Sequence, residues 1–551
     1  SILAQTPPTL PAFPGAEGYG RFSVGGRGGQ VFIINTLADP VPVDPSSTVT
    51  SLRECVIANG PRTCVFAVTG LIETSRELTI RNPYITIAGQ TSQGDGITIK
   101  SGANVDACIS IRSHDVIISN IKCRPGTGGT SLPALTPTPG ARTGDAVDSF
   151  SSCCGSDAGY DNYNYMLSHV SGSWSVDEVF DFGYARDITL QDSMCSEPLN
   201  HATHSYTADD PDIGHSKCSL LWAMGSGNVS YIRNLFAHAM DRYPEINPSD
   251  GYVDLVNNVF YNWGTTDSTV GGRSWVTHFS GHYGNPQVNV VGNYYKPGPN
   301  SDNRHRLRFD NPTSPDNPPL TPVGNTMTVY LDNTIDTTLG EITTVYKNQP
   351  GLTINYSSTP LGDAAYSIVS ADQAYQQVTN PVGAGDSFRI DCSGNKVARS
   401  DPVDTRIKND VLNGTGQIID SPSEVGGWPT IASVPACGDQ DADGMPDTWE
   451  TAYGLNASIN DSALDQNGDG YTNIEDYIFG ISAAGVPTPT LPAVRGDTNG
   501  DSKVDMVDLS TLLANFGGTE KTRLQGDVSG NDGVVSVADL STLLANFGMQ
   551  N

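Results

Sequence analysis

A short unit of two apolar strands joined by a polar turn recurs along this chain. The unit occurs in VIISNIKC, YMLSHVSG, ITLQDSMC, VSYIRNLF, VDLVNNVF and VNVVGNYY, which align on Asn120, His169, Asp192, Asn234, Asn258 and Asn293. Neighbouring units lie 23 residues apart at His169 and Asp192 and 24 apart at Asn234 and Asn258. A fixed period of this length is typical of a solenoid whose coils stack on one another.

We therefore predict a mostly β chain that folds as a right-handed parallel β-helix, with coils from Leu71 to near Pro429. Inward side chains of each strand would stack on their equivalents in the next coil, and the turn asparagines would hydrogen-bond from coil to coil. The alternative is a β-sandwich, but the hairpin dipeptides of such a fold are scarce here. Before the coils, SLRECVIANG predicts a short helix in a cap.

The residues after Gly438 are strongly acidic, with 18 acidic and 4 basic residues between Gly438 and Asn551. DQDADGMPDTWE places oxygen donors at positions 1, 3, 5, 9 and 12 of a twelve-residue loop, with Gly444 at the sharp turn, as calcium loops do. These donors are Asp439, Asp441, Asp443, Asp447 and Glu450. DQNGDGYTNIED repeats the pattern with Asp465, Asn467, Asp469 and Asp476. The alternative is a set of solvated acidic turns.

The nonapeptide LSTLLANFG occurs twice, from Leu509 and from Leu540, each time after another calcium-type loop. The first of these loops offers Asp497, Asn499, Asp501, Asp505 and Asp508. The second offers Asp527, Ser529, Asn531 and Asp539, with one extra residue that weakens its expected calcium affinity. The four loops resemble thrombospondin type-three-like calcium repeats followed by a type I dockerin-like module. That resemblance implies bound calcium and a cohesin-type or cell-surface partner.

Charged residues on the predicted coils gather upstream of one arginine, Arg242. They are Asp145, Asp177, Glu178 and Asp181, followed by Lys217. Unpaired buried charges are costly, so this set fits a groove better than a core. Calcium in such a groove would bridge the carboxylates to an acidic sugar. The alternative for Arg242 is an ordinary surface ion pair.

Several motifs resemble the pectate lyase superfamily, polysaccharide lyase family one, between Phe13 and about Pro429. They are FPGAEGYGRFSVGGRGG, PYITIAGQTSQGDGITIK, SHVSGSWSVDE, NLFAHAMDRYPEI, VDLVNNVFYNWG and VVGNYYKPGP. The resemblance implies a calcium-dependent pectate lyase that cleaves α-1,4-polygalacturonate by β-elimination and leaves 4,5-unsaturated oligogalacturonates.

The same resemblance assigns the site residues. Arg242 is the base, and Lys217 and Pro244 contact substrate. Asp145, Asp177, Glu178 and Asp181 hold the catalytic calcium. Asn247 and Thr143 depart from the family pattern, because the family has an arginine and an aspartate at these places. His169 is a structural turn residue.

Two other functions stay open from the sequence. One is a pectin lyase acting on methyl-esterified pectin, although such enzymes replace the calcium carboxylates with cationic groups. The other is a non-catalytic, calcium-stabilised carbohydrate-binding or adhesin β-helix. Ultraviolet assays on both polymers would separate them.

The net charge of −30 excludes an electrostatic grip on nucleic acid or on an acidic membrane. Ten cysteines without paired C-x-x-C spacing indicate disulfides in a secreted protein, possible pairs being Cys55 with Cys64, Cys108 with Cys123, and Cys195 with Cys218. The start at Ser1 predicts a mature N-terminus, and no apolar run is long enough to span a membrane. We expect a monomer with a catalytic β-helix at 1–430, calcium repeats at 438–485, a linker at 486–494 and a dockerin-like module at 495–551.

Overall fold

The computed structural model describes residues 10–41, 43, 49–102, 105, 107–127, 148–151, 162–202, 214–222, 227–247, 251–264, 275–281, 284–310, 326–347, 352–363, 365–432, 434–480, 504, 506–519, 521, 534–545 and 547. The chain divides into two compact units, Ser1–Ile481 and Ser482–Asn551. The first unit therefore contains both the predicted β-helix and the first two acidic loops.

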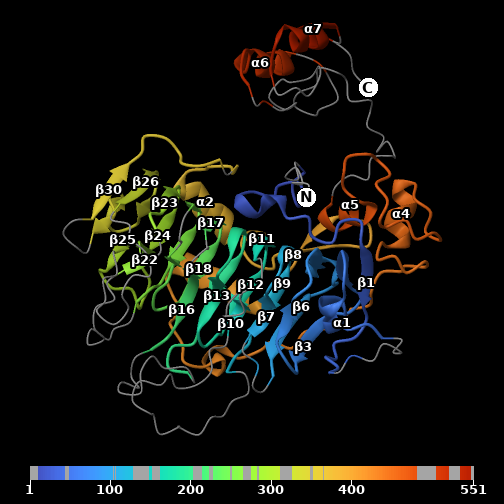
Figure 1. Cartoon of the computed structure of the whole chain (residues 1–551), viewed down its shortest axis with the longest axis horizontal. Helices are drawn as coiled ribbons and strands as arrows, with labels where there is room; N and C mark the ends of the chain where they lie inside the picture. The colour runs from blue at the N-terminus through green and yellow to red at the C-terminus, as the bar shows by residue number, and fades with distance from the viewer. Residues whose placement is uncertain are drawn as a thin grey trace, which may run out of the picture. The chain divides into compact units, whose positions relative to one another are not determined.

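Three long sheets build the first unit (Figure 1). The first sheet runs in the order β1 (Gln30–Ile34), β2 (Arg62–Phe66), β5 (Ile85–Ala88), β8 (His114–Ser119), β11 (Tyr163–Ser168), β14 (Arg186–Gln191), β17 (Gly227–Ile232), β20 (Tyr252–Val256), β23 (Gln287–Val291), β26 (Thr326–Asp332) and β30 (Thr353–Tyr356). The second, which carries the candidate site, runs in the order β4 (Leu78–Ile80), β7 (Ala107–Ile111), β10 (Asp148–Ser151), β13 (Glu178–Gly183), β16 (Lys217–Trp222), β19 (Glu245–Ile246), β22 (Trp275–Ser280), β25 (His305–Asp310) and β29 (Tyr346–Lys347). The third runs in the order β3 (Gly70–Thr74), β6 (Ile97–Ser101), β9 (Ile121–Cys123), β12 (Ser171–Ser173), β15 (Met194–Ser196), β18 (Leu235–Ala237), β21 (Val259–Tyr261), β24 (Tyr294–Lys296), β27 (Ile335–Asp336) and β28 (Gly340–Glu341).

Neighbouring strands in each sheet come from successive coils and pair in parallel, apart from β27 with β28. This arrangement confirms the predicted parallel β-helix. Its interior holds stacks of fully buried apolar residues such as Ile85, Val116 and Tyr165. Because the interior and the neighbouring strands are both apolar, the inward positions are occupied mainly by β-branched and aromatic residues.

An asparagine ladder crosses the coils as the sequence predicts. The side-chain amide of Asn234 donates to Oδ1 of Asn258 at 3.0 Å, and that of Asn258 donates to Oδ1 of Asn293 at 3.0 Å. Each of these side-chain oxygens also accepts from the backbone of the preceding coil, as Oδ1 of Asn234 does from the Ser193 amide at 2.9 Å. The ladder thus satisfies buried turn groups that face no water.

The sequence alignment was wrong by one residue in the earlier coils. His169 and Asp192 have φ of 53° and 49°, like Arg233 and Asn257 at 54° and 56°. They therefore occupy the left-handed turn position, and the ladder position is the next residue. Asparagine and aspartate tolerate left-handed turns as well as forming ladders, so residue type alone does not separate the two positions.

The predicted end of the coils near Pro429 is also wrong. The last parallel strand is β30, and the chain then runs back along the β-helix as α2 (Ala371–Thr379), β31 (Phe388–Ile390), β32 (Lys396–Ala398) and α3 (Pro402–Asn413). Buried ion pairs hold this segment to the third sheet: Lys122 to Asp386 at 2.7 Å and Arg124 to Asp401 at 2.6 Å.

The N-terminal end of the β-helix is covered by α1 (Leu52–Ile57), the predicted cap helix, whereas η1 (Tyr19–Phe22) packs on β11, β14 and β17 in the middle of the first sheet. The calcium-loop segment packs nearby through α4 (Asp447–Tyr453) and α5 (Asn473–Phe479). Phe13 stacks on Phe479 with 4.7 Å between ring centroids, and Arg27 pairs with Glu475 at 2.9 Å. The first two acidic loops are thus part of the first unit.

Disulfides join Cys55 to Cys64, Cys195 to Cys218, and Cys392 to Cys437. The first two confirm predicted pairs. The predicted pair Cys108 with Cys123 is wrong, since both are buried free thiols. The two thiols are hydrogen-bonded neighbours in the core, and the thiol of Cys108 also donates to the carbonyl of Ile99 at 3.5 Å. Cys153 and Cys154 lie outside the described residues.

In the second unit, α6 (Met506–Ala514) and α7 (Val537–Ala545) carry the duplicated nonapeptide. They enclose a small core of Val504, Leu512, Val535 and Leu543. Within the described parts of both units, no helix has the length and apolar character needed to span a membrane.

Candidate active site

The predicted site residues come together on the second sheet. Glu178, the first residue of β13, lies opposite Lys217, the first residue of β16, and Lys217 forms a parallel bridge with Asp241. Residues far apart in sequence therefore become neighbours about 4.8 Å apart, the distance between adjacent strands.

Arg242 sits at a tightly held turn between β18 and β19. Its φ of 60° is left-handed, an uncommon conformation for a long side chain. The Arg242 carbonyl accepts from the Ser219 amide at 3.0 Å, and the Tyr243 amide donates to the Val276 carbonyl at 3.0 Å. The backbone on both sides of the guanidinium is therefore fixed by neighbouring coils.

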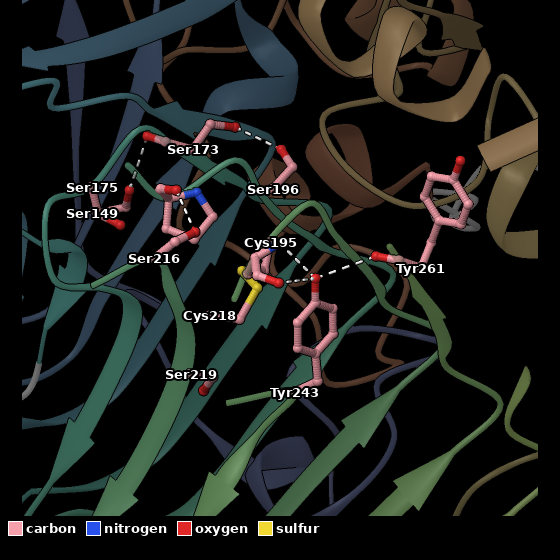
Figure 2. Close-up of a disulfide and its surroundings, with 12 residues drawn as sticks. Ser149, Ser173, Ser175, Cys195, Ser196, Ser216, Cys218, Ser219, Tyr243 and Tyr261 are labelled. Carbon is pink, nitrogen blue, oxygen red and sulfur yellow. Dashed lines mark hydrogen bonds between the residues drawn. A yellow bond between two sulfur atoms is a disulfide. The ribbon is translucent and has the colours of Figure 1, made fainter. Parts of the chain in front are cut away.

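Tyr243 anchors this turn from the inside. Its ring is fully buried, and its hydroxyl accepts from the Ala239 amide at 2.6 Å and faces the Tyr261 carbonyl at 3.2 Å. Figure 2 shows Tyr243 beside the Cys195–Cys218 disulfide, which joins the third sheet to β16 next to Lys217. The disulfide and the tyrosine thus stabilise the inner side of the site.

The guanidinium of Arg242 lies between two carboxylates and is only 8% exposed. One of its amino groups contacts Glu178, and its Nε lies 3.0 Å from Oε2 of Glu245. An arginine held by two acids, one on β13 and one on β19 on either side of β16, is more than a solvated surface pair. Glu245 was not predicted as a site residue from the sequence, although it lies within the DRYPEI motif.

A chain of alternating charges continues from Glu245 across the next two coils. Oε1 of Glu245 lies 3.3 Å from Nδ1 of His278, and Nε2 of His278 lies 3.2 Å from Oδ2 of Asp310. Asp310 in turn pairs with Arg308 at 2.7 Å. Burial lowers the pKa of His278, but the hydrogen bonds that its ring donates to Asp310 and Glu245 outweigh burial and leave that pKa raised.

Lys217 is fully buried, and its Nζ lies 2.6 Å from Oδ1 of the equally buried Asp241. The ammonium therefore has its counter-ion within the protein. Lys217 was predicted as a substrate contact, and its partner Asp241 was not predicted as a site residue.

An acidic cluster lies beside the arginine. Donor atoms of Asp177, Glu178 and His215 all lie within 4.8 Å of one another. Nε2 of His215 is 2.5 Å from Oδ1 of Asp177, so the histidine orients that carboxylate. Calcium prefers oxygen ligands, and the two carboxylates suit it better than the imidazole does.

Asp148 adds a further buried carboxylate to this region. Burial raises its pKa well above the ordinary range, and the nearby Asp181 and Asp177 raise it further. Among the described residues, Oδ1 of Asp148 has no hydrogen-bond partner. Uncompensated negative charge of this kind fits a bound cation. Asp148 and His215 were not predicted from the sequence. Each lies close to a predicted residue, Asp148 to Asp145 in TGDAVDSF and His215 to Lys217 in GHSKCSLL.

Asp181, Pro244 and Asn247 are the other positions singled out from the sequence that the structure describes. Oδ1 of Asp181 accepts from the Trp222 indole at 2.9 Å, apart from the group formed by Asp177 and Glu178. The Pro244 carbonyl accepts from the His278 amide at 3.0 Å. Asn247 follows β19, and its side-chain amide lies 3.5 Å from Oε1 of Glu245. Asp145 and Thr143 lie outside the described residues.

The first C-terminal loop brings most of its predicted donors together. Asp439, Asp441 and Asp443 form one group within 4.8 Å, and Asp443, Glu450 and Asp461 form a second. Burial and mutual repulsion raise the pKa of Asp443 to about 7 and that of Glu450 to about 8. Asp461 was not identified from the sequence.

The second loop closes on itself in a similar way. Asp465 accepts from the amides of Gly468 and Gly470 at 2.6 and 3.0 Å, and Asn467 donates to Asp469 at 3.0 Å and to Asp476 at 3.1 Å. Burial and the neighbouring acids raise the pKa of Asp476 to about 8. In the third and fourth loops only Asp508 and Asp539 belong to the described residues, and both are fully buried.

Comparison with known proteins was made on the sequence and on the fold. No protein-family model matches the chain. The chain is 31% identical over 490 residues to a probable pectate lyase C of Aspergillus fumigatus, covering 86% of this chain and 94% of that protein. It is 31% identical over 480 residues to a probable pectate lyase C of Aspergillus flavus, covering 85% and 93%. A probable pectate lyase 12 of Arabidopsis thaliana is 27% identical over 291 residues, half of each chain.

Among solved structures, the cedar pollen allergen jun a 1 covers 67% of this chain and 92% of its own, with a TM-score of 0.39 and 16% identity. A Bacillus subtilis pectate lyase mutant covers 70% and 99%, with a TM-score of 0.40 and 13% identity. These scores are too low to add to the assignment, which rests on the sequence relatives. Their identity extends over nearly their whole length, and the protein therefore belongs to the pectate lyase family and is a polysaccharide lyase.

Proposed function

We propose that the enzyme cleaves α-1,4-linked polygalacturonate by calcium-dependent β-elimination, with Arg242 as the base. The observation that supports this most is the position of Arg242, a nearly buried guanidinium beside a carboxylate cluster on an otherwise regular sheet. The product would be a 4,5-unsaturated oligogalacturonate. The relatives named pectate lyase support the substrate class.

Asp177 and Glu178, with Asp148 and Asp181 nearby, are the residues that would hold the catalytic calcium. The unpartnered oxygen of Asp148 and its raised pKa fit such a cation. Bound calcium would neutralise the uronate carboxylate and acidify the proton at C5. Asp145 stays a predicted ligand outside the described residues.

Arg242, as the neutral guanidine, would take the C5 proton and become a guanidinium, while the C4–O4 bond breaks and the departing oxygen takes a proton from water. Two carboxylates beside a guanidinium stabilise its charged form. Proton removal by Arg242 therefore requires at least one of these carboxylates to bind another partner. Recruitment of Glu178 as a cation ligand would take one of them away from Arg242. Glu245 would then keep the side chain oriented from the other side.

Lys217 would contribute positive charge to the substrate groove, in keeping with its predicted role as a substrate contact. Because its ammonium is buried against Asp241, the pair would act mainly by orienting the start of β16 and the backbone before Arg242. Pro244 would shape the same wall of the groove.

The test is ultraviolet absorbance of the unsaturated product on polygalacturonate and on methyl-esterified pectin, with calcium or with chelator. Calcium-dependent product on polygalacturonate that is lost in Arg242→Ala supports the proposal. Product on methylated pectin that persists with chelator would make the enzyme a pectin lyase instead.

We further propose that the enzyme is secreted and that its C-terminal module attaches it to a cohesin-type or cell-surface partner. Three disulfides fit an oxidising compartment. The two helices of the second unit each expose the same apolar positions of the duplication, Met506 with Val537 and Leu513 with Leu544, between 53% and 68% exposed. Such repeated exposed residues fit a partner surface. Capture of the full chain by a purified cohesin, and its loss in Leu513→Asp with Leu544→Asp, would test this proposal.

A further inference from the structure

The first C-terminal loop contains a buried acid with no counter-charge. Glu450 is fully buried, and neither of its carboxylate oxygens has a hydrogen-bond partner among the described residues. Asp443 beside it is also fully buried. An unpaired carboxylate inside a protein is strongly unfavourable, so this arrangement requires a cation.

The groups facing Glu450 come from two separate pieces of chain. Asp441 and Asp443 belong to the twelve-residue loop, whereas Asp461 follows α4 and enters the same group within 4.8 Å of Asp443 and Glu450. The Asp461 amide also donates to Oδ2 of Asp443 at 3.3 Å. Neither oxygen of Asp441 has a hydrogen-bond partner among the described residues.

Asp447 occupies the loop position that the sequence pattern assigns to a ligand, but it has another task. Its Oδ1 accepts from the Gln440 amide at 2.7 Å, and its own amide donates to the Gly438 carbonyl at 2.9 Å. Asp447 therefore closes the loop at the start of α4. It is not part of either acidic group.

We propose that a calcium ion binds inside this cluster and that Asp461, from outside the loop, is its ligand in place of Asp447. The donors are all carboxylate oxygens, which suit a hard divalent cation with many oxygen ligands. No lysine or arginine pairs with any of them in the described part of the chain. This site is separate from the catalytic cluster and does not rest on the proposed reaction.

The same residue couples the first loop to the second. The Asn473 side-chain amide donates to the Asp461 carbonyl at 3.0 Å and to its Oδ1 at 3.2 Å, while Oδ1 of Asn473 accepts from the Gln466 amide at 3.2 Å. Gln466 is the second residue of the next acidic loop. Calcium at Asp461 thus orders the segment that precedes and enters the second loop.

The experiment uses the full chain and terbium ions, with emission excited through tryptophan. Trp449 is buried next to Glu450, so the emission component lost in Trp449→Phe reports this site. We expect Asp461→Asn to weaken terbium binding about tenfold or more, because a ligand charge is lost. Asp447→Asn, which keeps the loop-closing acceptor, should stay within about threefold of wild type.

The opposite order, with Asp447→Asn weakening binding and Asp461→Asn not, would overturn the proposal in favour of the loop pattern. Absence of any Trp449-dependent emission would overturn it as well. If Asp461→Asn does not fold, Glu450→Gln replaces it, with the same expected loss. Lyase activity at saturating calcium should be unchanged in Asp461→Asn, so failure of this site and failure of the proposed reaction give different results.

Discussion

Nε of Arg242 lies 3.0 Å from Oε2 of Glu245, three residues further along the chain. This pair is the first link of a row of alternating charges that passes through His278 and Asp310 to Arg308. Each member lies on the next strand of the second sheet or beside it. The orientation of the guanidinium therefore depends on coils that follow it in sequence.

Replacement of Arg242 by alanine should reduce turnover on polygalacturonate by about 100-fold to 10,000-fold, the range for loss of a general base. Arg186→Ala is the control, because Arg186 lies on β14 of the first sheet and pairs there with Asp187. Product formation is followed by ultraviolet absorbance. An unchanged rate in Arg242→Ala would assign the base to another residue.

Replacement of His278 by asparagine should lower kcat about tenfold, a typical loss for a residue that orients another, with little change in KM. The variant removes the imidazole that bridges Glu245 and Asp310 and leaves Arg242 itself in place. His305→Asn is the matched control, since His305 is exposed on the neighbouring strand and stacks on Tyr346. Equal losses in both variants would point to a general effect on the sheet.

Replacement of Asp241 by asparagine should destabilise the fold by about 3–5 kcal/mol, because Lys217 would be left buried without its counter-ion. The double variant Lys217→Met with Asp241→Leu should recover much of that stability, since apolar residues can replace a buried pair. Guanidinium unfolding measures both. Full activity of the stable double variant would remove Lys217 from the substrate groove.

Chelated protein should lose stability as the pH rises from about 5 to 8. Burial and neighbouring acids raise the pKa of Asp443 from 3.8 to about 7 and that of Glu450 from 4.5 to about 8 in the folded chain. The cation-free fold thus retains protons that the unfolded chain releases, and this contribution is lost as the pH passes 7 to 8. Thermal melts with chelator should show the fall, and added calcium should remove most of it. A flat profile with chelator would contradict the expected pKa shifts.

The repeat period and the alternation of apolar residues determine the β-helix from sequence alone, because every coil must bury the same inward positions. The disulfides Cys55–Cys64 and Cys195–Cys218 and the acidic loops were also predictable from the sequence. Their residues either lie close together in the chain or lie one coil period apart. In the earlier coils the polar turn was predicted one residue out of register, because asparagine suits both the left-handed position and the ladder position.

The residues that complete the two sites were decided by tertiary structure. Asp148 and His215 come close to Asp177, and Glu245 reaches Arg242, only because successive coils stack in register, and Asp461 reaches Glu450 only because the chain after α4 returns to its own loop. A sequence pattern describes spacing along the chain. The Coulomb interactions that define these clusters depend on distances across strands, which only the folded coils establish.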